Sequence, residues 1–272
     1  MSRGHRRCLA PLRSHSLKPM PDETSLGGNL NAAVRVGDTV RRRAGPWTPA
    51  VHALLRYLDR VGFEAPRVLG MDEQGREIFP FIPGEAHSGT IEPVPDRIFG
   101  EGRLLEAARL LRRYHDAVAG FESPVDARWR LIAPTSHELI CHNDWTPWNA
   151  LFRDGRLALM LDWDLAGPGS RLWDVVNAAY CWVPLLAGER LFDIDERARR
   201  LARFCDAYGV DDRAEVLPTL RLRLSFVARF VEDQARSGDP GFRTLMEMDV
   251  PAKMAADAAF IEEHRATFER AL

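Results

Sequence analysis

Residues 139–164 read LICHNDWTPWNALFRDGRLALMLDWD, and this stretch decides the fold of the chain. At its centre, Asp154-Gly155 is the strongest short-range signal for a β-hairpin. A two-residue turn there places Asn149 opposite position 160 at the open end of the hairpin, and Asp162 lies two residues further on. Opposed residues sit roughly 5 Å apart and diagonal ones about 7–8 Å. The stretch therefore predicts that Asn149 and Asp162 converge on one point.

The side chains that meet at this point suit phosphate chemistry. An amide oxygen and a carboxylate are hard ligands of the kind that Mg²⁺ takes alongside substrate phosphates. Asp144 lies on the loop that leads into the same open end, and Thr146-Pro147 keeps this loop from being helical. A carboxylate beside a metal site can accept a hydroxyl proton, which phosphoryl transfer to an alcohol requires.

The chain before this stretch is rich in strand patterns. A hairpin with a Gly37-Asp38 turn is predicted over residues 31–43, and a second hairpin is predicted over residues 67–82. Between them, Thr48-Pro49 opens a helix that runs to residue 61, with Thr48 as the N-cap. This part of the chain therefore reads as a small β-rich unit with one helix, and Pro83-Gly84 ends it.

The rest of the chain reads as mainly helical. An apolar stripe predicts a helix from Leu104 to Val118, and the β pattern of residues 138–162 interrupts the helical region. The last hundred residues predict four helices, near residues 171–187, 195–208, 212–236 and 250–271. The fold class is therefore α+β, with a smaller β-rich part followed by a larger helical part.

Composition excludes several classes of protein. The chain has 272 residues and a formal net charge of -2, which argues against a general nucleic-acid binder. Its four cysteines lack metal-clip spacing and indicate free thiols in a reducing compartment. The longest uncharged apolar stretch, residues 175–188, is too short to span a bilayer. We therefore expect a cytoplasmic protein that binds neither nucleic acid nor membrane.

The first 21 residues differ from the rest. They carry five positive charges, and no acidic residue occurs before Asp22. A transit peptide has a similar composition, but no apolar segment of a secretory signal is present. We predict that residues 1–21 are a disordered arm or the product of an upstream start codon.

The spacing His142-x-Asp144-x-x-x-x-Asn149, followed by Asp162 at a strand end, resembles a known catalytic loop and metal-binding aspartate. These belong to the aminoglycoside phosphotransferases, the choline kinases and, more distantly, the protein kinases. Gly167-Pro-Gly, followed by Arg171-Leu-Trp-Asp174, is similar to the family's segment after the metal aspartate. The resemblance is strong over residues 139–176, loose over 29–83 and weak in the C-terminal helices.

The resemblance implies a two-lobed, protein-kinase-like fold. The N-terminal, nucleotide-binding lobe would span residues 22–83 and the catalytic and acceptor-binding lobe residues 84–272. It also implies a kinase that transfers the γ-phosphoryl group of ATP or GTP, with Mg²⁺, to a hydroxyl of a small acceptor.

The family roles carry over residue by residue. Asp144 becomes the catalytic base, Asn149 and Asp162 become Mg²⁺ ligands, and His142 braces the loop. Asp174 would cap and hold the catalytic loop from the following helix. Asp164 could support the metal site, hold a second metal ion or cap the next turn.

The N-terminal lobe departs from the family pattern. Gly27-Gly28-Asn29 stands where a glycine-rich phosphate loop is expected, so Gly28 and Asn29 are the predicted nucleotide contacts there. The only lysines, Lys18 and Lys253, cannot be the strand lysine of a kinase. Arg42 is the predicted replacement, because it shares the inward face of Val40. The helix from residue 48 carries no glutamate, so the usual lysine–glutamate pair is absent; an exposed basic strand is the alternative reading.

Two other functions stay open. The missing lysine–glutamate pair would suit an inactive nucleotide-binding relative with a regulatory role. The strand ending in Asp162-x-Asp164 would suit a haloacid-dehalogenase-type phosphatase, although that fold needs alternating strands and helices after the motif. The acceptor stays open among an antibiotic, choline, an amino alcohol and a sugar, because no acidic excess stands out in the C-terminal helices.

Overall fold

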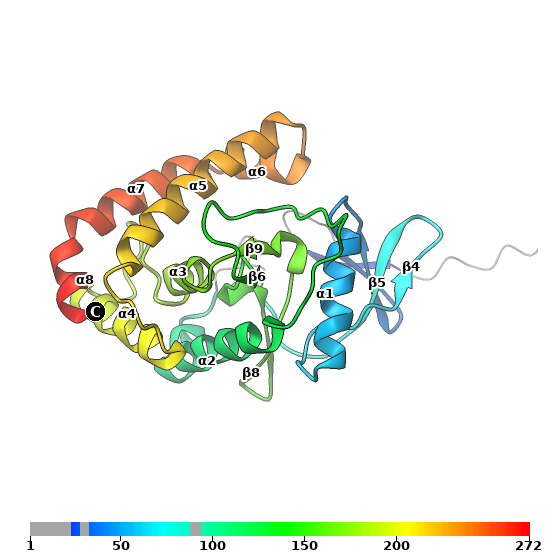
Figure 1. Cartoon of the computed structure of the whole chain (residues 1–272), viewed down its shortest axis with the longest axis horizontal. Helices are drawn as coiled ribbons and strands as arrows, with labels where there is room; N and C mark the ends of the chain where they lie inside the picture. The colour runs from blue at the N-terminus through cyan, green and yellow to red at the C-terminus, as the bar shows by residue number, and fades with distance from the viewer. Residues whose placement is uncertain (1–22, 28–32, 88–93) are drawn as a thin grey trace, which may run out of the picture.

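The computed structural model describes residues 23–27, 33–87 and 94–272. The predicted arm at residues 1–21 and the predicted nucleotide contacts Gly28 and Asn29 lie outside the described residues. Figure 1 shows the chain in two parts, with strands β1–β5 and helix α1 at one end and helices α2–α8 at the other.

The first part is an antiparallel sheet with the strand order β1-β2-β3-β5-β4. The strands are β1 (Glu23–Gly27), β2 (Ala33–Val36), β3 (Thr39–Arg43), β4 (Gly70–Met71) and β5 (Arg76–Pro80). Val36 pairs with Thr39 across the predicted Gly37-Asp38 turn, where Gly37 has a φ of 60°. The pairing of β3 with β5 joins the two predicted hairpins into one sheet.

Helix α1 (Thr48–Arg60) packs beside the sheet. Its buried side chains Val51, Leu54 and Leu58 recur at helical spacing, as predicted. The predicted N-cap is wrong by one residue, because Trp47 takes that position and no side chain caps it. The hydroxyl of Thr48 instead accepts a hydrogen bond from Gly45 N at 3.0 Å, which stabilises the turn before the helix.

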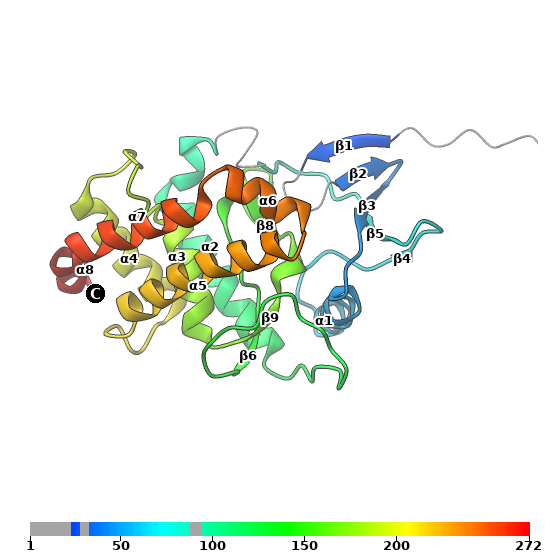
Figure 2. The same cartoon turned by 90° about the horizontal axis from the view of Figure 1, so that it is seen from above.

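The second part consists of helices around two short pairs of strands. Its helices are α2 (Glu101–Val118), α3 (Arg171–Trp182), α4 (Ile194–Tyr208), α5 (Val216–Arg236), α6 (Pro240–Glu247), α7 (Val250–Glu263) and α8 (Arg265–Ala271). Its strands are β6 (Leu139–Cys141), β7 (Ala150–Arg153), β8 (Arg156–Met160) and β9 (Gly167–Gly169). β6 pairs with β9, and β7 pairs with β8. Figure 2 shows α5, α6 and α7 running over one side of this part.

The prediction of four C-terminal helices is wrong, since residues 171–272 form six. Gly238, with a φ of 99°, ends the segment after α5, and Asp239 then caps α6 by accepting from Gly241 N at 3.0 Å. His264 separates α7 from α8. Helical periodicity alone does not reveal such short interruptions between consecutive helices.

The connection after β5 brings the chain onto the second part. Glu85 and Phe152 exchange two backbone hydrogen bonds, each 2.8 Å long. A Cβ atom on Gly84 would lie 2.7 Å from Phe152 O, so only glycine allows this approach. Pro83-Gly84 stays our prediction for the lobe boundary.

One hydrophobic core runs through both parts of the described chain. Leu54 and Leu58 of α1 belong to the same buried cluster as Leu111 of α2 and Trp173 of α3. Cys141, Cys181 and Cys205 are free and buried. Among the helices of the described ranges, none is both long and apolar enough to cross a bilayer.

Candidate active site

The β7–β8 hairpin forms at the predicted turn but in a shifted register. Asp154 and Gly155 take φ values of 51° and 73°, which a two-residue hairpin turn of the primed type requires. A bulge between Leu151 and Phe152 then changes the pairing, and Leu161 N donates to Asn149 O at 2.8 Å. The prediction that Asn149 faces position 160 is therefore wrong by one residue. The bulge brings Asn149 opposite the residue that directly precedes Asp162.

Asp162 follows β8 in a left-handed backbone conformation, with φ 56° and ψ 75°. This conformation is uncommon for a residue other than glycine and concentrates at functional sites. Its Oδ1 atom is buried, has no hydrogen-bond donor in the described part of the chain, and lies 3.3 Å from Arg42 Nη2. The ion pair with Arg42 therefore leaves this oxygen without a hydrogen bond in the described chain, with capacity for a metal cation.

The amide of Asn149 is oriented by Asp144. Asn149 Nδ2 donates to Asp144 Oδ2 at 2.8 Å and to Asp144 O at 2.9 Å. Because the nitrogen is engaged, the amide oxygen is the atom left for a ligand. Asn149 and Asp162 line the same cavity, which has a volume of about 830 Å³.

This donor set fits Mg²⁺ bound together with phosphate. No group of three histidine, cysteine or acidic side chains in the described ranges could hold a metal ion by itself. Mg²⁺ is usually bound through one or two protein oxygens plus substrate phosphates, so a two-ligand site agrees with its chemistry.

Asp144 lines this cavity, and its environment favours the protonated form. Burial, followed by the negative charge of Asp162, raises the pKa of Asp144 to about 8. Arg223 and the hydrogen bond from Asn149 act in the opposite direction.

His142 is buried within the loop and braces its backbone. Its Nε2 donates to Leu161 O at 3.1 Å, and its Nδ1 accepts from Asp144 N at 3.2 Å. Burial lowers the pKa of His142, although Asp174 opposes this effect. A neutral imidazole is the form that can donate at one nitrogen and accept at the other.

Asp174 holds the same loop from helix α3. It accepts from His142 N at 2.7 Å and from Asn143 N at 2.8 Å. Its third partner is His115, whose Nε2 lies 3.1 Å away. Burial acts to raise the pKa of Asp174, but His115, the charge of His142 and the hydrogen bond from His142 N together lower it. Helix α3 itself is capped by Ser170, which accepts from Trp173 N at 3.2 Å.

Arg42 is the β3 arginine that points toward these residues. Its guanidinium contacts Asp164 in a close ion pair and lies near Asp162. Burial acts to lower the pKa of Arg42, but Asp164, Asp162 and Glu77 together raise it. Arg41 faces the other way and donates to Thr39 at 2.6 Å. Asp164 forms its ion pair with Arg42 from within the 3₁₀ turn Trp163–Leu165. It does not cap this turn, because Asp162 holds the N-cap position.

Glu77 was not predicted as a site residue, yet it is the acidic side chain that lies beside Arg42. Glu77 lies directly across from Arg42 in the β3–β5 pair, with 4.0 Å between Arg42 Nε and Glu77 Oε2. Its other oxygen lies 2.8 Å from His52 Nε2 of α1. Helix α1 lacks a glutamate, as noted from the sequence, and strand β5 supplies Glu77 in its place. Its alternation with buried Phe79 on β5 is the sequence signal for an inward acid.

Arg223 of α5 is a second residue that sequence analysis missed. It is 3% exposed, and its guanidinium donates to Asn143 Oδ1 at 2.9 Å and also to Asn143 O. Asn143 has a φ of 65°, so this partner fixes an uncommon backbone conformation next to Asp144. Arg223 and Asn143 are 80 positions apart along the chain, so no local sequence pattern indicates that they are in contact.

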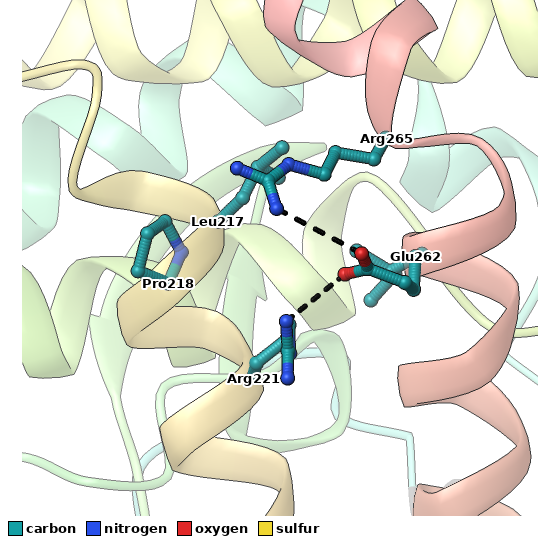
Figure 3. A pocket seen from close by; sticks show the side chains of 6 residues that line it. Leu217, Pro218, Arg221, Glu262 and Arg265 are labelled. Carbon is teal, nitrogen blue, oxygen red and sulfur yellow. Dashed lines mark hydrogen bonds and ion pairs between the residues drawn. The ribbon is translucent and has the colours of Figure 1, made fainter.

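Two of the five tryptophans near the motif line the cavity. Trp148 is 37% exposed and Trp163 is buried. Trp145, Trp173 and Trp182 are fully buried core residues. A smaller pocket of about 60 Å³ lies away from the motif, between α5 and the α7–α8 region (Figure 3). Its polar contacts join Glu262 to Arg221 and Arg265.

The chain is similar to known proteins. A family model described as "Phosphotransferase enzyme family" matches residues 96–219. The chain is 32% identical over 275 residues to a trifolitoxin immunity protein of Rhizobium leguminosarum bv. trifolii, with 93% of this chain and 100% of that protein covered.

Two solved structures show the same fold. A choline/ethanolamine kinase family protein from Mesorhizobium loti has a TM-score of 0.60 at 17% identity, covering 92% of this chain and 90% of its own. An amicoumacin kinase in complex with AMP-PNP, Ca²⁺ and its ligand has a TM-score of 0.59 at 12% identity, covering 87% and 88%. The predicted two-lobed, kinase-like α+β fold is confirmed.

Proposed function

The chain belongs to the phosphotransferase enzyme family, and we propose that it transfers the γ-phosphoryl group of ATP or GTP to a hydroxyl of a small molecule. The observation that carries the proposal is the meeting of four side chains at one cavity: Asp144, Asn149, Asp162 and Arg42. The four side chains come from three separate segments of the chain, and each has the chemistry that one part of phosphoryl transfer needs.

Asp144 is the proposed catalytic base. Its carboxylate lines the cavity, its neighbour Asn149 orients one oxygen, and His142 fixes its backbone amide. It takes the proton of the acceptor hydroxyl as the new phosphorus–oxygen bond forms, and the nucleoside diphosphate leaves.

Asn149 and Asp162 are the proposed Mg²⁺ ligands. Bound Mg²⁺ would offset phosphate charge and the Asp162 charge that helps to raise the pKa of Asp144. The single protein charge among these ligands comes from Asp162, so the two residues should contribute unequally to metal affinity.

Arg42 is the proposed phosphate contact of the N-terminal lobe. Its guanidinium stands beside Asp162, at the side of the cavity lined by Val40 and Phe79 of the sheet. An arginine fork suits a phosphate as well as the carboxylates that hold it here. Gly28 and Asn29 stay predicted nucleotide contacts.

The relative that is named an immunity protein suggests a protective role for the activity. We propose that phosphorylation alters a harmful small molecule in the same compartment as the protein, the cytoplasm. A nucleotide-binding relative that protects without turnover is the second candidate, and the engagement of Arg42 by three carboxylates favours it.

Nucleoside diphosphate release separates the two. The protein is incubated with Mg²⁺, either ATP or GTP, and pools of hydroxyl compounds, and products are identified by a mass increase of one phosphoryl group. Transfer that Asp144→Asn abolishes supports the kinase. Nucleotide binding without transfer to any pool contradicts it.

A further inference from the structure

The acceptor end of the cavity has an apolar wall. It lies under helices α5, α6 and α7, which Figures 1 and 2 show running over this side of the molecule. Side chains of these three helices line it: Val227, Phe230, Val231, Phe242, Leu245 and Met254. Such a wall gains free energy by covering apolar surface of a ligand, at about 25 cal/mol per Å².

Two polar side chains of this cavity each carry one donor atom that lacks an acceptor. Arg223 Nε and Asn177 Nδ2 are buried, and neither has a hydrogen-bond partner among the described residues. Both residues line the cavity. A buried donor without an acceptor costs free energy, which a ligand oxygen placed there would recover.

The acidic groups at this end are already engaged. Asp257 of α7 accepts from Tyr180 Oη at 2.5 Å and from Ala187 N at 2.7 Å. Asp144 is the other acid on this side in the described lining, and its place is beside the reacting hydroxyl. Lys253 adds a positive charge at the exposed rim, with no ion-pair partner within residues 23–27, 33–87 and 94–272. An ammonium group bound here would lose water, find the Asp257 carboxylate already hydrogen-bonded by two donors, and face the positive charge of Lys253.

We propose that this end of the cavity takes an uncharged, carbonyl-bearing and largely apolar hydroxyl compound, and that it excludes polycationic amino sugars. Carbonyl oxygens of the ligand accept from Asn177 Nδ2 and Arg223 Nε, and its apolar part covers Phe230 and its neighbours. The proposal rests on the proposed function for the position of the reacting hydroxyl beside Asp144. The hydrogen-bonding and charge arguments do not depend on turnover.

Binding without nucleotide tests the ligand class. Three hydroxyl-bearing probes are titrated calorimetrically: the blocked peptide acetyl-leucyl-seryl-phenylalanine amide, the neutral lactone erythronolide, and the polyamine kanamycin. We expect at least one neutral probe to bind about ten-fold or more tightly than kanamycin, and the two neutral probes separate an amide from a lactone source of the carbonyl. Equal or tighter binding of kanamycin overturns the proposal, as does failure of both neutral probes to bind at about 1 mM.

Variants of two lining residues sharpen the test. Asn177→Leu removes one orphan donor and should weaken the better neutral probe about five-fold. Lys253→Glu should strengthen kanamycin about five-fold, because it turns a repulsive charge into an attractive one. Arg221→Glu makes the same charge change on α5 at the small pocket of Figure 3 and should leave kanamycin unchanged. An unchanged affinity in both lining variants contradicts the assignment.

Failure of this inference differs from failure of the proposed function. Phosphate transfer to kanamycin, with no binding of the neutral probes, would keep the kinase and overturn the ligand class. Neutral-probe binding that depends on Asn177, with no transfer from ATP or GTP, would keep the ligand class and contradict the kinase.

Discussion

At the scale of single residues, Asp144 is the most decisive position. We expect Asp144→Asn to lower kcat about 10²–10⁴-fold, because the amide cannot take the acceptor's proton. Nucleotide affinity should stay nearly unchanged, since Asp144 is not a proposed metal ligand. Steady-state kinetics and nucleotide titration measure the two effects separately.

The matched control is Asp154→Asn, at the exposed turn of the same hairpin. Asp154 has a φ of 51°, which asparagine tolerates, so this control should retain full activity. Retention of more than a tenth of wild-type kcat by Asp144→Asn would remove Asp144 from the role of base.

Asp162 and Asn149 should differ in their effect on metal binding. Metal and nucleotide are expected to bind together, because the protein offers few oxygens of its own. Asp162→Ala should abolish the Mg²⁺ dependence of nucleotide binding, and Asn149→Ala should reduce it less because an amide is uncharged. Calorimetric titration of nucleotide with and without Mg²⁺ measures this dependence. Equal affinity of the wild-type protein in both conditions would rule out the metal assignment.

At the scale of elements, Asp174 of helix α3 holds the backbone of the loop that carries Asp144. Asp174→Asn puts an amide NH₂ against one of the two backbone N–H groups that the carboxylate now accepts. We expect a loss of about 3 kcal/mol in the free energy of unfolding, together with a lower kcat, since a buried partner is left unpaired. Urea denaturation measures the loss.

Asp116→Asn is the surface counterpart of this change. Asp116 pairs with Arg112 at 2.9 Å on the exposed side of α2, so its effect should stay within about 0.5 kcal/mol. Similar stabilities for the two variants would show that Asp174 does not hold the loop.

The pairing of β3 with β5 sets the position of Arg42. Glu77→Gln can keep a hydrogen bond to His52 but removes the charge that draws Arg42 away from Asp162 and Asp164. We expect the nucleotide KM to rise about five-fold with little change in kcat, because Arg42 is then held more firmly by the other carboxylates. The exposed turn variant Glu73→Gln is the control. An unchanged nucleotide KM would limit Glu77 to a packing role.

At the scale of the whole molecule, one hydrophobic core joins the two parts of the described chain. We predict that deletion of residues 1–21 leaves Tm unchanged, since their basic, acid-free composition has no apolar periodicity to bury. Differential scanning calorimetry of the full and shortened chains makes the comparison. A drop of more than about 3 °C, roughly 1 kcal/mol for a chain of this length, would show that the arm packs on the fold.

Local sequence determined a large part of this protein. The Asp154-Gly155 turn, the buried face of α1 and the inward direction of Arg42 all follow from backbone preferences and from the periods of strands and helices. The motif from His142 to Asp162 could be found in the same way, because its residues lie within one loop and one hairpin. These features depend on neighbours only a few positions away.

Tertiary structure decided the partners of those residues. The bulge that shifts Asn149, the pairing of Glu77 with Arg42, and the contact of Arg223 with Asn143 join segments that are distant along the chain or differ by one register step. Periodicity says which face of an element is buried, but not which element covers it. Packing of α5 and α7 over the cavity likewise decides which polar groups are left without partners, and so which ligand the cavity accepts.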